Sequence, residues 1–213
     1  MSILHHPGED MLLDYASGAG GEAISLVVAT HLAFCSQCRK AVARAEAMGG
    51  ALMDKLSPAA MGEAALAATL ARLDAPAAPV TAPPLSQAGV PGPLRPYLKG
   101  GLANIAWRHM GPRLAYLPLF RRGGLSVKLL KGVAGADTGS HSHRGMEFTL
   151  VLQGGFTDVT GSYAPGDLQI ADSDTWHNPV ADPGEDCINL AVTTAPLRFK
   201  GLVPTIAGKL FGF

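Results

Sequence analysis

The sequence lacks the features that mark several large classes of protein. Its 213 residues carry 17 acidic and 17 basic side chains, for a formal net charge of zero, and contain no run of lysine or arginine. A neutral surface binds phosphate backbones poorly, so direct binding to nucleic acid is not expected. The N-terminal residues do not read as a signal peptide, and no uncharged window reaches the length that spans a bilayer. We therefore expect a cytoplasmic protein without a membrane segment.

Cysteine is also scarce, with only three residues, and two of them, Cys35 and Cys38, lie three positions apart. So few cysteines favour a reducing compartment, where thiols bind metal ions more often than they form disulfides. The third, Cys187, falls in the alternating apolar run 186–194 and is expected to be a buried strand residue.

His31, Cys35 and Cys38 form the pattern His-x-x-x-Cys-x-x-Cys within a segment of helical periodicity. The spacing places the His31 imidazole on the apolar face of one helix, and Ser36 is expected to cap a second helix from Gln37 through Met48. Thiolates are favoured at a helix start by the helix dipole, and zinc prefers sulfur and nitrogen ligands in a tetrahedron. The pattern predicts a structural zinc site.

The fourth zinc ligand must come from elsewhere in the chain. His5 and His6 stand just ahead of Pro7 and of a short helical pattern, and we favour His6, with His5 as the substitute. The alternatives to a metal site are that His31 is an ordinary core residue and that the Cys-x-x-Cys pair is redox-active or accidental. A thioredoxin-like dithiol needs a strand–helix–strand context that this segment lacks.

The sequence divides into a helical part and a β part. Residues 1–75 are predicted to form a small zinc-binding domain of four short helices, the last starting at Ser57 and Pro58 and carrying Leu66, Leu70 and Leu73 on one face. So small a bundle buries little surface, so zinc binding is expected to contribute to its folding. Residues 76–96 hold seven of the 16 prolines and are predicted to be a semi-stiff linker rather than packed structure.

Residues 97–213 change to short runs of strand character separated by turn signals, which predicts an antiparallel β-barrel or sandwich. The expected strands cover residues 114–120, 124–132, 146–155, 167–171 and 186–194. The apolar tail 201–213 is expected either to close the barrel or to pack outside it. The fold class is thus α+β in two domains.

A second group of metal ligands lies in the β part. His141, His143 and Glu147 have the same parity, so on a regular strand their side chains leave one face, and His177 can add a fourth ligand from a later strand. Three imidazoles and a carboxylate inside a small barrel bind a divalent transition metal. Zinc is our choice, although manganese, iron and nickel also suit this set; the alternative is a surface pair of histidines.

The run Gly135-x₅-His141-x-His143-x₃-Glu147-x₆-Gly154 resembles the first cupin motif at every defining position. The second cupin motif is partly kept: Gly166 and His177 have the right separation, but Asp172, Asp174 and Ala181 replace the usual Pro, Gly and Asn. The segment around His31, Cys35 and Cys38 resembles the zinc-binding anti-sigma domain. With both modules in this order, nearly the whole chain is similar to the ChrR-type anti-sigma factors.

That resemblance implies the ligand set His6, His31, Cys35 and Cys38 for zinc, and His141, His143, Glu147 and His177 for the cupin metal. It implies a bacterial regulator that forms a 1:1 complex with an extracytoplasmic-function sigma factor and releases it under oxidative stress, such as singlet oxygen. Several redox-switched members have a cysteine where this chain has His6. A disulfide switch is therefore less plausible here, and the signal is expected to enter through the cupin domain.

Two other functions compete with this hypothesis. Cupins with three histidines and a glutamate include dioxygenases, isomerases and decarboxylases, so the chain could be a metal-dependent enzyme with an accessory helical domain. A metal-storage or structural protein is a third possibility. We favour the non-enzymatic regulator, because an enzyme has no evident need for a metal-dependent helical module on a proline-rich linker.

Overall fold

The structure, a computed structural model, describes residues 2–73, 89–98 and 101–199. The helices are α1 (Glu9–Ser17), α2 (Glu22–Phe34), α3 (Ser36–Met53) and α4 (Ala65–Leu73), with the 3-10 helices η2 (Gly92–Tyr97) and η3 (Leu102–Asn104). Within the described residues, no helix is long and apolar enough to cross a membrane.

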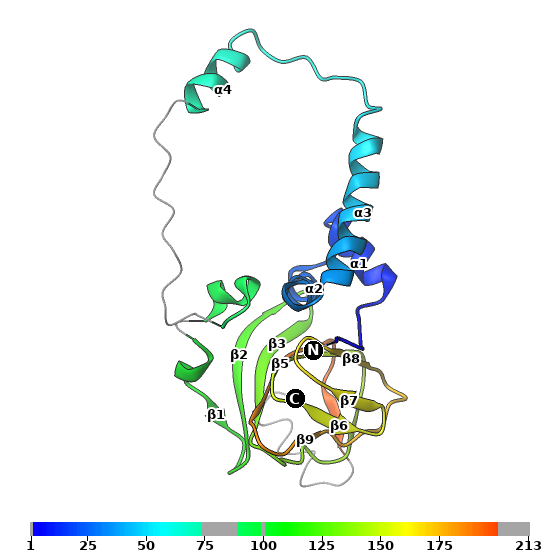
Figure 1. Ribbon diagram of the computed structural model, residues 1–213, viewed down its shortest axis with the longest axis vertical. Helices are drawn as coiled ribbons and strands as arrows, with labels where there is room; N and C mark the ends of the chain where they lie inside the picture. Colours follow the sequence, from blue (N-terminus) through cyan, green and yellow to red (C-terminus); the bar gives the residue numbers. More distant parts are fainter. Residues whose placement is uncertain (1, 74–88, 99–100, 200–213) are drawn as a thin grey trace.

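The strands build an antiparallel barrel below the helices (Figure 1). Its larger sheet has the order β1-β2-β3-β10-β5-β8, and the smaller sheets β7-β6-β9 and β11-β4 complete the wall. The strands are β1 (Arg108–His109), β2 (Leu114–Arg122), β3 (Leu125–Gly132), β4 (His141–His143), β5 (Glu147–Gln153), β6 (Phe156–Asp158), β7 (Gly161–Tyr163), β8 (Leu168–Ala171), β9 (Val180–Ala181), β10 (Cys187–Thr193) and β11 (Leu197–Phe199). The predicted α+β class is confirmed, and Cys187 is buried in a strand as expected.

Helix α2 joins the two parts of the molecule because it is apolar on more than one side. Ala23, Leu26 and Val27 pack into the same core as Leu129, Leu150 and other residues of the larger sheet. On another side, Val28 packs with Leu12 of α1 and Val42 of α3. A helix that is apolar all round is normally buried, and each fully buried Leu or Val contributes about 2 kcal/mol.

The end of the predicted linker differs from the expectation. Residues 74–88 and the tail 200–213 lie outside the described residues, but residues 89–96 are packed rather than extended: Val90 and Leu94 are buried in the core beneath α2. Tyr97 Oη donates a hydrogen bond of 2.8 Å to Glu22 Oε1, and Arg122 pairs with the same carboxylate. The apolar side chains between the prolines outweigh the tendency of proline to keep a segment extended.

Helix α4 stands apart from α1, α2 and α3 (Figure 1), and none of its residues is buried. It begins at Ala65, so the predicted start at Ser57 and Pro58 was wrong. Residues 57–62 include Pro58 and Gly62 and are exposed, so no packing contact compensates for their poor helix propensity.

Candidate metal centres

The N-terminal ligand group assembles where α2 passes into α3. His31 lies in the last turn of α2, Cys35 links the two helices, and Cys38 lies in the first turn of α3. Cys35, not Ser36 as predicted, is the N-cap of α3, and its Sγ accepts the Cys38 N–H at 3.3 Å. A sulfur atom at this position both caps the helix and faces the other ligands.

His6, and not His5, completes this group, which is buried except for His6 itself. The distances from His6 Nδ1 are 3.5 Å to Cys35 Sγ and 3.4 Å to Cys38 Sγ. A tetrahedral zinc ion with sulfur at about 2.3 Å and nitrogen at about 2.0 Å would hold those atoms about 3.5 Å apart. The spacing of the side chains therefore fits zinc.

His31 supplies the second nitrogen. Its Nδ1 lies 2.7 Å from the carbonyl oxygen of Gly166, so Nδ1 carries the proton and Nε2 keeps its lone pair. Nε2 is buried without a hydrogen-bond partner. An unpaired buried nitrogen costs free energy, and a metal ion among His6, Cys35 and Cys38 would satisfy it.

The electrostatics of this group also favour a metal. Burial, followed by the hydrogen bond and charge of Cys35, raises the pKa of the Cys38 thiol to about 12. Burial also lowers the pKa of His31. Two adjacent buried thiolates are unfavourable by themselves, whereas a divalent cation between them stabilises both.

The second group lies inside the barrel and is buried at all four positions: His141, His143, Glu147 and His177. His141 and His143 share β4, whereas Glu147 starts β5, so these residues do not follow one regular strand as the parity argument assumed. A bend at residues 144–145 separates the two strands, and at Gly145 an added Cβ would lie 2.3 Å from Thr194 Oγ1. His177 joins from a later loop through a bridge to His141.

The ring nitrogens of this group converge. His143 Nε2 and His177 Nε2 lie 3.0 Å apart, as expected of two nitrogens about 2.1 Å from one metal ion and at right angles to each other. His143 Nδ1 is buried without a hydrogen-bond partner. Burial lowers the pKa of His141 and of His143 to about 4, so both rings are neutral and able to coordinate.

Two of these histidines are oriented by hydrogen bonds to their second ring nitrogen. His141 Nδ1 donates to Gly139 O at 2.8 Å, and His177 Nδ1 donates to Asp158 Oδ2 at 2.7 Å. Asp158 also accepts from Gln169 and Thr160. Such partners hold ligand rings toward a metal ion. The sequence analysis missed Asp158, because its proximity to His177 depends on the packing of β6.

A cavity of about 60 Å³ extends from Glu147 and His177 toward Thr149, Asn189 and Cys187. This volume holds a few water molecules or a small ligand beside the metal position. Burial raises the pKa of Glu147 to about 7, and nearby Lys128 opposes that rise. Lys128, which the sequence analysis also missed, is buried, and burial together with Arg121 lowers its pKa to about 8.

We expect the purified chain to retain about two metal ions per molecule, one in each group. Cys35→Ser removes a thiolate from the first group and should leave about one ion, while His143→Ala should remove the other ion independently. Elemental analysis after dialysis measures the count. The exposed His109→Ala serves as the control and should retain both ions; an unchanged count in Cys35→Ser would show that the first site does not exist.

The fold and the two groups together define a protein with a helical part joined to a cupin-like barrel, each carrying residues that could hold a metal ion. A family model described as the ChrR Cupin-like domain matches residues 101–197. The anti-sigma-E factor ChrR of Cereibacter sphaeroides is 42% identical over 218 residues, covering 99% of each chain. The crystal structure of Rhodobacter sphaeroides SigE in complex with the anti-sigma ChrR matches with a TM-score of 0.77 and 40% identity, covering 90% of this chain and 99% of that one.

The chain therefore belongs to the ChrR family of anti-sigma factors. Membership places it in a family of transcription regulators rather than among the cupin enzymes, as the sequence hypothesis preferred.

Proposed function

We propose that this chain binds and inhibits an extracytoplasmic-function sigma factor through its N-terminal domain, residues 1–75, which zinc holds together. The cupin domain, residues 97–213, senses oxidative stress through its own metal and triggers release, with singlet oxygen as the proposed signal and residues 76–96 as the joint. The observation that carries the proposal is the near full-length match to a ChrR chain solved in complex with SigE.

The proposed zinc ligands are His6, His31, Cys35 and Cys38, and the proposed cupin ligands are His141, His143, Glu147 and His177. Zinc is the proposed ion at the first group because two thiols and two imidazoles are its preferred donors. At the second group the donors suit zinc or another divalent transition metal.

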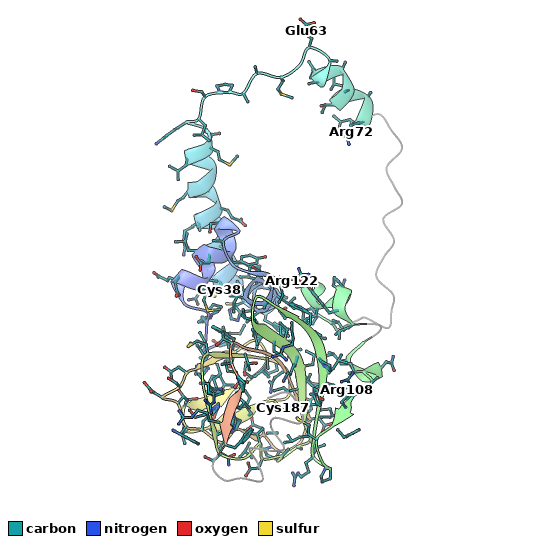
Figure 2. All side chains as sticks on the ribbon, turned by 180° about the vertical axis from the view of Figure 1, so that it is seen from behind. Cys38, Glu63, Arg72, Arg108, Arg122 and Cys187 are labelled. Carbon is teal, nitrogen blue, oxygen red and sulfur yellow. The ribbon has the colours of Figure 1, made fainter. Side chains whose placement is uncertain are left out.

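Exposed apolar side chains on two helical segments support a partner of this kind. On α3 and the residues after it, Met48, Leu52, Met53 and Leu56 are each at least two-thirds exposed, and on α4 Leu66, Leu70 and Leu73 are 51 to 75% exposed. Figure 2 shows the C-terminal end of α3 with the residues after it, and α4, projecting away from the barrel. Large apolar side chains exposed together on a folded chain commonly mark a protein-binding site.

A reconstituted complex tests the proposal. The chain mixed with the extracytoplasmic-function sigma factor of the same bacterium should form a 1:1 complex, measured by light scattering, and inhibit transcription by its RNA polymerase holoenzyme. Leu70→Asp should weaken binding at least tenfold, because it places a charge on the apolar face of α4. Val159→Asp is the control, since Val159 is also exposed, at 80% against 51% for Leu70, but lies between β6 and β7 of the barrel. Equal affinity for the sigma factor in both variants would exclude α4 from the interface.

A further inference from the structure

The turn between β7 and β8, residues 164–167, lies against the N-terminal ligand group although it belongs to the barrel. Asp167 is 2% exposed, and its Oδ1 accepts the backbone N–H groups of Leu4 at 2.7 Å and His5 at 2.8 Å. Its Oδ2 accepts the N–H of Ala164 at 2.9 Å. The next residue, Leu168, donates its N–H to His5 O at 3.1 Å. The segment that carries His6 is thus attached to the barrel.

The same turn orients a second member of the group. Gly166 O accepts the proton on His31 Nδ1, which directs Nε2 toward His6 and the two cysteines. Two of the four ligand side chains, His6 and His31, therefore depend on the barrel for their positions. Only Cys35 and Cys38 are positioned by the helices alone.

Gly166 itself allows this close approach. A Cβ at this position would lie 2.8 Å from both Ile3 Cδ1 and Phe34 Cβ, and the φ of +95° is rarely adopted by other residues. Any side chain at position 166 would push the N-terminal segment and the end of α2 away from the turn.

The turn also leads directly to the barrel ligands. Three residues after Gly166, Gln169 donates a hydrogen bond of 2.8 Å to Asp158 Oδ2. The same oxygen atom accepts the His177 Nδ1 proton. A short run of β8 therefore connects the residues that orient His31 with those that orient His177.

We propose that the β7–β8 turn is a docking latch for the N-terminal metal site: while it is engaged, His6 and His31 are held on the ion, and when it separates the site loses zinc faster. This inference rests on the proposed zinc site and deepens the proposed function, because it gives the barrel a physical means of changing the helical domain. A change at the barrel ligands can shift the equilibrium between the engaged and the separated turn only if it stabilises one of these two states more than the other.

Site-specific thiol labelling of the full chain tests the latch. The zinc-loaded protein is mixed with a chelator and a thiol-alkylating reagent, and mass spectrometry follows modification of the peptide that contains Cys35 and Cys38. Gly166→Ala and Asp167→Ala should increase the labelling rate about 10- to 100-fold, in proportion to the loss of metal affinity that follows when partners orienting metal ligands are removed. Asp167→Asn should be intermediate, since its amide oxygen can still accept from Leu4 and His5.

Matched controls separate the latch from general strain. Gly184 has a φ of +101° and no atom within 4 Å of an added Cβ, so Gly184→Ala introduces backbone strain without a clash. Asp186 Oδ1 accepts the backbone N–H of Ala134, and both residues belong to the barrel rather than to the helices. Gly184→Ala and Asp186→Ala should label at the wild-type rate.

Each outcome decides between the hypotheses. Faster labelling of Gly166→Ala and Asp167→Ala supports the latch, provided that the barrel of each variant unfolds at the wild-type temperature. Labelling at the wild-type rate in Asp167→Asn and Asp167→Ala overturns it and leaves the zinc site standing. If zinc never protects Cys35 and Cys38 in the wild-type chain, the proposed zinc site itself fails, and the latch with it. If Gly166→Ala does not fold, the two Asp167 variants carry the test.

Discussion

Cys38→Ser is expected to abolish binding to the sigma factor and to unfold α1–α3. Cys38 is 3% exposed, packs with Leu12, Val28 and Val42, and supplies one of the four converging ligand atoms. Structural zinc contributes about 10–16 kcal/mol in small zinc domains, whereas a whole domain is stable by only about 5–15 kcal/mol. Because the two free energies are of similar size, loss of zinc should leave this small bundle unfolded.

Circular dichroism and a binding titration with the sigma factor measure this effect, and we expect affinity to fall more than 100-fold. Cys187→Ser is the matched control, because Cys187 is also a buried cysteine but lies in the barrel core, where it lines the cavity beside Glu147 and His177 and is not part of the N-terminal ligand group. Figure 2 shows Cys38 at the junction of helices and barrel and Cys187 within the barrel. Tight sigma binding by a zinc-free Cys38→Ser chain would contradict the zinc-dependent mechanism.

His141→Ala is expected to leave sigma binding near the wild-type value while blocking release under singlet oxygen. His141 is a proposed ligand of the barrel group, and its ring contacts His143, His177 and Phe199 of the barrel, so the exposed apolar surface of α3 and α4 should stay intact. Without the metal, the barrel cannot respond to oxidation at this site. The sigma factor should then stay inhibited, and reporter expression should remain at its uninduced level. The measurement is a promoter reporter in cells exposed to light and a photosensitiser.

The control for this experiment must separate sensing from folding. Thermal unfolding should show a folded His141→Ala barrel, and the exposed His109→Ala on β1 should induce the reporter normally. Normal induction in a folded His141→Ala strain would rule out the barrel metal as the sensor. An unfolded barrel with permanent inhibition would instead show that the metal serves folding.

The packing of α2 bears on how the two domains communicate. Leu26 and Val27 lie in one core with the larger sheet of the barrel, while His31 on the same helix belongs to the proposed zinc site. Separation of the domains would expose this apolar surface and also remove the Gly166 hydrogen bond from His31. We therefore expect a structural change in the barrel to alter the stability of the helical domain.

Several features of the protein were predictable from short stretches of sequence. The spacing of His31, Cys35 and Cys38 reflects one helix ending and another beginning, which is a local property of a few residues. The pairing of His141 with His143 likewise follows from the alternation of a strand. Both groups were recognised for this reason, and the two-part fold followed from the change from helical to alternating periodicity.

Tertiary structure alone decided the features that join distant segments. The sequence analysis favoured His6 and kept His5 as the substitute, but what turns His6 toward the cysteines is a distant contact: Asp167, more than 160 residues away, binds the backbone of Leu4 and His5. Asp158 reaches His177 only through the packing of the barrel, and residues 89–96 are packed because α2 covers them. Periodicity reports the local conformation of the chain, whereas these contacts depend on which surfaces bury one another, and that is decided by packing over the whole molecule.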